Sequence, residues 1–176
     1  QQEIGTRLLE RLEFFAINPQ TILDLGMGTG FVTQQLAYAY PKADIIGLDF
    51  AESMLKVAQH KRNNDTPNYH LICGDINLLP IADNSVDLIF SNFSFQWCEN
   101  ISALFTQCRR VLKNDGLLIF TIPGPHTLYE LRSTLNEVDP DYEHVNNFID
   151  MHNIGDILVQ NKFAHPVMDN DEFTLT

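Results

Sequence analysis

The stretch DLGMGTG, from Asp24 to Gly30, places three glycines at alternate positions directly after the apolar run TIL. Glycines that follow a strand usually mark a tight turn that a ligand approaches closely. A dinucleotide site, however, requires the spacing G-x-G-x-x-G. Starting from Gly26 and Gly28, the third glycine of that pattern would fall at Phe31. The turn is therefore predicted to admit a ligand to its backbone, but not a dinucleotide.

Outward from this turn, apolar runs alternate with segments of helical periodicity for more than a hundred residues. This alternation is typical of a mostly parallel sheet with helices on both faces, an α/β fold. Strands are predicted at residues 21–25, 43–49, 68–75, 85–92 and 117–123. Helices are predicted at residues 4–15, 31–40, 51–62 and 101–115, the last of them ended by Gly116.

The length of 176 residues and the hydrophobic content of 44% fit one domain, residues 1–176. Residues 21–123 are predicted to form its ligand-binding core. After Pro123 the alternation weakens, with helices expected at 124–139 and 154–163, so residues 124–152 are predicted to be an insertion on the substrate side. The end of the chain, DEFTLT at 171–176, alternates like a strand. We therefore expect the sequence to be truncated before a last strand, and to be trimmed at its start.

The composition limits the partners and the location. With 11 basic and 23 acidic residues, the net charge of -12 would repel nucleic acids and anionic membranes. No apolar stretch approaches the roughly 18 residues of a membrane span, and no leader is recognised, so we expect a cytoplasmic protein. Cys73, Cys98 and Cys108 lack a CxxC spacing and are predicted to be reduced and mostly buried. The six histidines show no metal-ligand spacing, and no metal is predicted.

Acidic residues end the strands that follow the glycine turn. Asp49 closes the second strand, where its carboxylate could accept hydrogen bonds from both hydroxyls of a ribose. Asp75 closes the third strand and could accept from an exocyclic amine, while Ile76 could lie on an aromatic base. Any one such acid is more often a helix cap or a solvated strand end. Asp24, Asp49 and Asp75 together, at the ends of three consecutive strands, instead favour a ligand built from adenine and ribose.

These residues resemble the class I S-adenosylmethionine (SAM)-dependent methyltransferases, over roughly Thr21 to Pro123. The resemblance implies a Rossmann-like fold and SAM as the cofactor, with S-adenosylhomocysteine as its product. It also implies that Asp24 and the glycine backbone hold the amino acid end, Asp49 the ribose, and Asp75 with Ile76 the adenine. The full implied cofactor-binding set is Asp24, Gly26, Met27, Gly28, Gly30, Asp49, Phe50, Met54, Gly74, Asp75, Ile76, Ser91 and Asn92.

The stretch SNFSFQWC, from Ser91 to Cys98, narrows the resemblance to one family among these methyltransferases. Together with TLYELR, HVNNF and the segment after residue 149, it is similar to the malonyl-acyl carrier protein O-methyltransferases, the BioC family of biotin synthesis. That family implies methylation of the free carboxylate of a malonyl thioester, with acyl carrier protein as the partner. Phe93, Phe95 and Trp97 either line the reaction space or pack under the next helix.

A carboxylate acceptor is ionised near pH 7 and needs no general base. No certain catalytic residue is therefore predicted, and the candidates are Asn92, Gln96, Trp97 and Arg132. Arg132 could bind the malonyl carboxylate in a bidentate manner or could simply form a surface ion pair. His126, just past the fifth strand, is either a base or a packing residue.

Two short basic groups could meet the carrier protein, although such runs are usually solvated faces. They are Lys56, Lys61 and Arg62 in one helix, and Arg109, Arg110 and Lys113 in another. Two other functions stay open. One is methylation of a small molecule such as a quinone precursor. The other is a role without methyl transfer, because TLYELR also resembles the methyltransferase-like assembly factors of complex I, which act as arginine hydroxylases.

Overall fold

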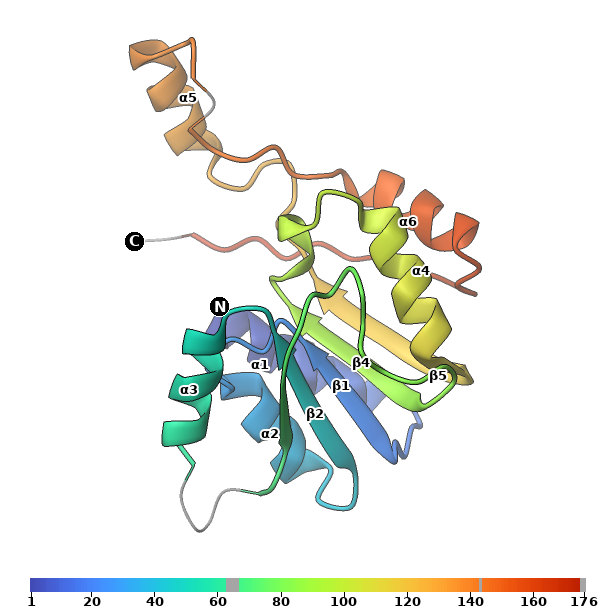
Figure 1. The fold of residues 1–176 in the computed structure, drawn as a ribbon. Coiled ribbons are helices and arrows are strands. Elements are labelled where there is room, and N and C mark those ends of the chain that lie inside the picture. Colours follow the sequence, from blue (N-terminus) through green and yellow to red (C-terminus); the bar gives the residue numbers. More distant parts are fainter. Residues whose placement is uncertain (63–66, 143, 175–176) are drawn as a thin grey trace. The chain divides into compact units, whose positions relative to one another are not determined.

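The structure is a computed structural model, and it describes residues 1–62, 67–142 and 144–174. Two compact units divide the chain, Gln1–Ile122 and Pro123–Thr176. The first contains the whole sheet (Figure 1). Its boundary lies close to the predicted end of the ligand-binding core at residue 123. The assignment of residues 1–176 to one domain, and of 124–152 to an insertion, stays a prediction.

The sheet of the first unit is parallel throughout and has the strand order β3-β2-β1-β4-β5. Its strands are β1 (Thr21–Leu25), β2 (Asp44–Asp49), β3 (His70–Cys73), β4 (Val86–Asn92) and β5 (Leu112–Thr121). The order reverses between β1 and β4, and in such sheets the ligand crevice lies outside the carboxyl ends of the strands at that reversal. The predicted α/β fold with a mostly parallel sheet is confirmed.

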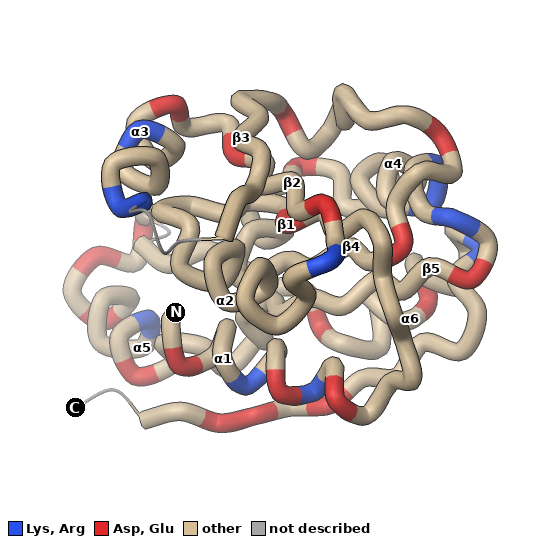
Figure 2. Tube along the Cα trace, turned by 90° about the horizontal axis from the view of Figure 1, so that it is seen from below, with Lys and Arg blue, Asp and Glu red and all other residues tan. Residues whose placement is uncertain are grey.

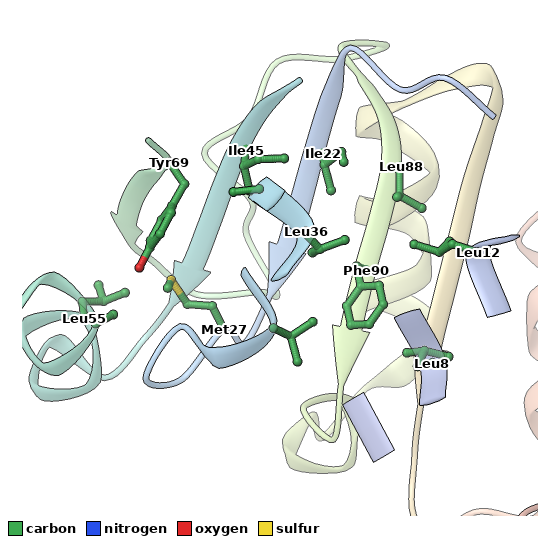
Figure 3. Close-up of a cluster of buried hydrophobic side chains, with 13 residues drawn as sticks. Leu8, Leu12, Ile22, Met27, Leu36, Ile45, Leu55, Tyr69, Leu88 and Phe90 are labelled. Carbon is green, nitrogen blue, oxygen red and sulfur yellow. The ribbon is translucent and has the colours of Figure 1, made fainter. Parts of the chain in front are cut away.

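The helices of this unit cover both faces of the sheet. They are α1 (Gln2–Arg11), α2 (Phe31–Ala39), α3 (Glu52–His60) and α4 (Ile101–Val111), with short 3-10 turns at Leu12–Phe14 and Phe95–Trp97. Side chains of α1, α2 and α3 form one buried cluster with alternate residues of β1, β2 and β4, among them Leu8, Leu36 and Phe90 (Figure 3). On the opposite face, Phe105 of α4 contacts Phe120 of β5 with ring centroids 5.6 Å apart.

The boundary between α4 and β5 differs from the prediction. Helical periodicity continues to residue 115, yet the helix ends at Val111 and β5 begins at Leu112. Leu112 is only 1% exposed and pairs with Val86 in the sheet, before a register shift leads to the pairing of Leu88 with Leu117. Burial of Leu112 within the sheet thus outweighs the local helical pattern, as tertiary packing often does.

Asp87 fixes the sheet at its amino end. Its Oδ2 accepts hydrogen bonds from the backbone N–H groups of Gln20 (3.0 Å) and Thr21 (2.9 Å), just before and at the start of β1. The ammonium of Lys113 lies 2.8 Å from Oδ1 and 2.9 Å from Oδ2. One carboxylate therefore ties the starts of β1, β4 and β5 together.

The second unit contains two helices, α5 (Tyr129–Val138) and α6 (Met151–Gln160). Helix α6 begins three residues before the predicted position, because the Asp150 carboxylate caps it by accepting the backbone N–H of His152 at 2.8 Å. Residues 171–174, which alternate like a strand in the sequence, have no regular structure. Alternation over so few residues does not supply a neighbouring strand to pair with. Residues 175 and 176 lie outside the described residues.

Acidic residues occur in both units, interspersed with fewer basic ones (Figure 2). Most members of the two basic groups already have partners. Lys56 pairs with Glu52, Arg62 lies over the ring of Tyr69, and Lys113 pairs with Asp87. The guanidinium of Arg110 donates to the carbonyls of Leu79 and Ile81 and to Asp83. These contacts all lie within the first unit, and a carrier-protein surface on these side chains stays a prediction.

Three further findings concern predicted features. All three cysteines are free, but only Cys108 is buried, whereas Cys98 is half-buried and Cys73 is exposed, so the prediction that they are mostly buried is wrong. Among the described residues, no helix has the length and apolar character needed to cross a membrane. No cluster of three or more His, Cys, Asp or Glu suited to a metal ion occurs in residues 1–62, 67–142 and 144–174.

Candidate functional site

The glycine turn between β1 and α2 is fastened to the end of β2. The backbone N–H groups of Gly26 and Met27 both donate to the carbonyl of Leu48, at 2.8 and 3.1 Å. Gly26, Gly28 and Gly30 have φ of +72°, +55° and +78°, in the left-handed region that side chains disfavour. The alternate glycines of the sequence thus produce a turn that lies at the crevice between β1 and β4.

Two of these glycines have different surroundings. A Cβ at Gly26 would overlap the Ser94 hydroxyl of the loop after β4, so this glycine is needed for packing inside the protein. A Cβ at Gly28 would have no heavy atom within 4 Å. The backbone at Gly28 therefore borders open space into which a ligand could fit. Met27, between them, points the other way, since its side chain is 7% exposed and lies in the buried cluster against Gly47 (Figure 3).

Asp24 is a buried acid at the carboxyl end of β1, and only 2% of it is exposed. Its Oδ2 accepts a hydrogen bond of 2.6 Å from the hydroxyl of Thr33 on α2. The pKa of Asp24 is raised from 3.8 to about 7, mainly by burial and in smaller part by the charge of Asp49, against the lowering effect of the Thr33 hydrogen bond. The carboxyl group can therefore change its charge near neutral pH.

Asp49, at the end of β2, is 7% exposed and holds the glycine turn. Its Oδ2 accepts the backbone N–H of Gly28 at 2.8 Å, and its Oδ1 accepts that of Ala51 at 2.9 Å. Each carboxylate oxygen can accept a second hydrogen bond. Asp49 is thus oriented by the backbone on two sides and keeps acceptor capacity for ligand hydroxyls.

The end of β3 supplies a more exposed part of the same edge. The backbone N–H of Gly74 donates to the carbonyl of Asp49 at 3.1 Å, which places the following residues next to the end of β2. The Asp75 carboxylate accepts the backbone N–H and side-chain amide of Asn77, at 2.8 and 2.9 Å. Near this acid, Phe50 is 78% and Met54 43% exposed, so both have apolar surface free for a ligand.

The side chains of the last two residues of β4 form hydrogen bonds with other residues of the protein. Ser91 is fully buried and donates its hydroxyl to the carbonyl of Leu25 at 2.8 Å. Asn92 donates its amide to the carbonyl of Gln1 at 3.1 Å and accepts the hydroxyl of Thr121 at 2.8 Å. The structure thus brings both to the predicted edge, but gives their side chains structural partners.

The loop after β4 separates the predicted aromatic residues. Phe95 is 1% exposed and contacts Phe105 and Phe120, so a role for it in lining the reaction space is wrong, and the packing alternative holds. Phe93 is partly exposed, and Trp97 is 69% exposed. Gln96 donates its amide to the carbonyl of Phe93 at 2.8 Å, while its Oε1 is buried and has no partner within the described residues. Burial, together with the charge of Asp75, raises the pKa of the Cys98 thiol to about 11, which indicates that this loop lies near the end of β3.

Arg132 belongs to the second unit. Its guanidinium donates to the carbonyls of Asn146 at 2.8 Å and Pro125 at 3.5 Å, while its buried Nε has no partner within the described residues. The surface ion pair considered for it is absent among those residues. His126 lies in the same unit, close enough to Asp150 to contribute to the lowered pKa of that acid, after the larger effect of the His152 hydrogen bonds.

Sequence reasoning missed two residues of this site. Thr33 and Thr121 have hydroxyls that bind Asp24 and Asn92, across 9 and 29 residues of sequence. Thr33 could have been suspected from its place one turn into the helix after the glycines. A hollow of about 230 Å³, lined in part by Tyr40, Lys42 and His70, lies at the amino ends of β2 and β3 and includes none of the predicted residues.

Known proteins match both the sequence and the fold. The family model described as a methyltransferase domain matches residues 23–120. A malonyl-[acyl-carrier protein] O-methyltransferase of Gallionella capsiferriformans is 44% identical over 100% of this chain and 62% of its own length. A malonyl-[acyl-carrier protein] O-methyltransferase 1 of Coxiella burnetii is 45% identical over 96% of this chain and 55% of its own length. The chain thus spans roughly three fifths of the relatives that it matches.

A solved structure shows the same fold at lower sequence identity. A SAM-dependent methyltransferase from Thermotoga maritima superposes with a TM-score of 0.68 and 19% identity, covering 93% of this chain and 73% of that one. The predicted resemblances in sequence and in fold are therefore confirmed. Because the family model covers more than half of its residues, the chain belongs to the methyltransferase-domain family.

Proposed function

We propose that this chain forms part of an enzyme that transfers a methyl group from SAM to the free carboxylate of a malonyl thioester on acyl carrier protein, in the cytoplasmic biotin pathway. The observation that carries the proposal is the identity of 44–45% over 96–100% of this chain with two proteins of that name. The comparisons favour neither the small-molecule methyltransferase nor the arginine hydroxylase.

The residues at the carboxyl edge suit the chemical groups of SAM. The space beside Gly28 would admit its amino acid end, and the free acceptor capacity of Asp49 suits the hydroxyls of its ribose. Phe50, Met54 and Ile76 offer apolar surface, and Asp75 an acceptor, for the adenine. Among the described residues, no basic side chain pairs with Asp24 or Asp49, so both could face a cationic ligand.

Bound SAM would supply a methyl group on a positively charged sulfur. The protein's own task is then to align the acceptor oxygen with that methyl group and to exclude water. A malonyl carboxylate is already ionised near pH 7, so no side chain has to remove a proton from it. The lack of a base suits the end of β4 and the loop after it, because the polar side chains of Ser91, Asn92 and Ser94 are occupied by hydrogen bonds within the protein.

Arg132, in the second unit, stays a proposed candidate for binding a carboxylate. Two backbone carbonyls accept hydrogen bonds from its guanidinium, at 2.8 and 3.5 Å. Among the predicted catalytic candidates, Arg132 is the only cation, and ion pairing with a carboxylate needs no base. Trp97, with its exposed ring, and Gln96 are the proposed neighbours of the acceptor in the loop after β4.

The test is incubation of the protein with methyl-labelled SAM and malonyl acyl carrier protein. We expect a label on the carrier protein that mild base releases, because the product is a methyl ester. Acetyl acyl carrier protein, which has no free carboxylate, is the matched control and should stay unlabelled. Label on the acetyl form, or no label on the malonyl form while SAM binds, would contradict the proposed acceptor.

A further inference from the structure

We propose that Thr121, at the end of β5, is a positioning residue that holds the loop of residues 93–97 in place through its hydroxyl. Asn92 and the backbone N–H of Phe93 are the groups through which it acts. The inference rests on the proposed function, because that loop is the proposed border of the methyl acceptor.

The hydroxyl of Thr121 is the centre of a chain of hydrogen bonds at the tips of β4 and β5. It donates to the Asn92 side-chain oxygen at 2.8 Å and accepts the backbone N–H of Phe93 at 3.1 Å. The Asn92 amide in turn donates to the carbonyl of Gln1 at 3.1 Å, before α1. One hydroxyl thus connects β5, the last residue of β4 and the first residue of the loop.

The loop needs such support because its first residue is strained. Phe93 has φ of +53°, a left-handed conformation that an L-residue with a bulky side chain rarely adopts. This conformation turns the chain sharply away from β4. The carbonyl of Phe93 then accepts the Gln96 amide at 2.8 Å, and the backbone N–H of Trp97 donates to the carbonyl of Ser94 at 3.2 Å.

The same turn brings the loop against the glycine turn. Ser94 lies so close to Gly26 that a Cβ there would overlap its hydroxyl, which donates to the Gly26 carbonyl at 3.4 Å. A hydroxyl at the end of β5 therefore affects the distance between the loop and the proposed cofactor site. The backbone N–H of Phe93 also donates to the carbonyl of Thr121, at 3.3 Å. Without the Thr121 hydroxyl, Asn92 would lose a donor and Phe93 the nearer of its two acceptors, and the loop could relax from its left-handed turn.

Trp97 makes this prediction measurable without any assay of function. It is the only tryptophan of the chain and is 69% exposed, so its fluorescence reports on this loop alone. Thr121→Val keeps the shape of the side chain but removes the hydroxyl, whereas Thr121→Ser keeps the hydroxyl. Thr106→Val is the matched control, because it removes the same group from an exposed face of α4, where the hydroxyl donates to the carbonyl of Ser102 at 3.0 Å.

We expect Thr121→Val to change the acrylamide quenching and emission maximum of Trp97, with Thr121→Ser and Thr106→Val like the parent. With malonyl acyl carrier protein as substrate, kcat/KM should fall on the order of tenfold for Thr121→Val alone, as expected when a partly buried hydroxyl with two hydrogen bonds is removed. The SAM affinity, measured by calorimetry, should stay within about twofold because the glycine turn keeps its other contacts.

Unchanged Trp97 quenching in folded Thr121→Val would overturn the proposal. So would equal effects of Thr121→Val and Thr121→Ser, because the hydroxyl would then be irrelevant. If the parent protein does not methylate the malonyl carrier protein, the proposed function fails, and the Trp97 signal alone still decides the role of Thr121.

Discussion

The carboxylates at the two ends of the sheet have pKa values that are shifted in opposite directions. At the amino end, burial alone would raise the pKa of Asp87, but hydrogen bonds from Lys113, Thr21 and Gln20, with the charge of Lys113, hold it below its ordinary value. At the carboxyl end, burial raises the pKa of Asp24 to about 7, with only the Thr33 hydroxyl acting in the other direction. One end has an acid paired with a cation, whereas the buried acids at the other end have no cationic partner in the part of the chain that the structure describes.

This difference separates stability from function. An acid paired with a cation and backbone donors stabilises the fold, whereas a buried acid without a cation costs free energy in the absence of a ligand. Active sites commonly retain such costly groups because a ligand supplies the missing charge. The proposed ligand carries a positive ammonium and a positive sulfonium, which is the charge that the carboxyl end lacks.

The largest predicted effect is that of Asp24→Asn on the pH dependence of stability. The folded pKa of Asp24 is about 7 against 3.8 in the unfolded chain, so the folded state holds the proton between these values. Its contribution is therefore full below pH 3.8 and is lost as the pH rises through about 7. Asn never ionises, so the parent loses stability between pH 5 and pH 8 and the variant does not. The free energy of unfolding of Asp24→Asn, relative to that of the parent, should therefore be about 3 kcal/mol higher at pH 8 than at pH 5. Urea unfolding at the two pH values measures the difference.

The matched control for this variant is Asp44→Asn, an exposed acid at the start of β2. It should change stability by less than about 0.5 kcal/mol at both pH values. Calorimetry should also show weaker SAM binding to Asp24→Asn, since the variant cannot supply a negative charge. A stability difference that does not grow between pH 5 and 8 would contradict the contrast between the two ends of the sheet.

The second prediction concerns Asp49, whose carboxylate both orients the glycine turn and keeps free acceptor capacity. Asp49→Ala should weaken SAM binding by about 1 to 3 kcal/mol, because a buried charge-assisted hydrogen bond to a ligand is worth that much. Calorimetric titration of SAM measures the effect, and Asp44→Asn again serves as the control. An unchanged dissociation constant in folded Asp49→Ala would show that this carboxylate does not bind the ligand.

Much of the fold was predictable because its signals are local. The glycines of DLGMGTG, the apolar strands and the acids at strand ends each result from the chemistry of a few neighbouring residues, and the parallel sheet followed from their alternation. The start of β5 was not predictable in this way. Leu112 leaves the helical pattern because it is buried against Val86, 26 positions earlier by the numbering, and no window of sequence contains that contact.

The residues of the candidate site also divide into those placed by local sequence and those placed by contacts between distant elements. The edge residues Asp24, Asp49 and Gly28 lie where the sequence places them, since each follows directly from a strand end. Phe95 could not be assigned, because its neighbours Phe105 and Phe120 come from other elements. The same holds for Thr121, whose importance lies in a contact across 29 residues. Sequence patterns thus predict the proposed cofactor side better than the proposed acceptor side.

The smallest predicted effect tests the amino end of the sheet. Asp87→Asn keeps one acceptor oxygen but loses the ion pair with Lys113, whose side chain is 41% exposed and partly screened by solvent. Stability at pH 7 should fall by about 1 to 2 kcal/mol, because the hydrogen bonds from Gln20 and Thr21 would then end on a neutral oxygen instead of a charged one. Because the folded pKa lies below 3.8, the deficit should persist at pH 5 and shrink only as the pH falls below that value.

SAM affinity should stay within about twofold of the parent value, since the substitution lies at the other end of the sheet. A loss of SAM binding comparable to that of Asp49→Ala, without unfolding, would mean that the two ends are coupled and that the division between a stabilising end and a binding end is wrong.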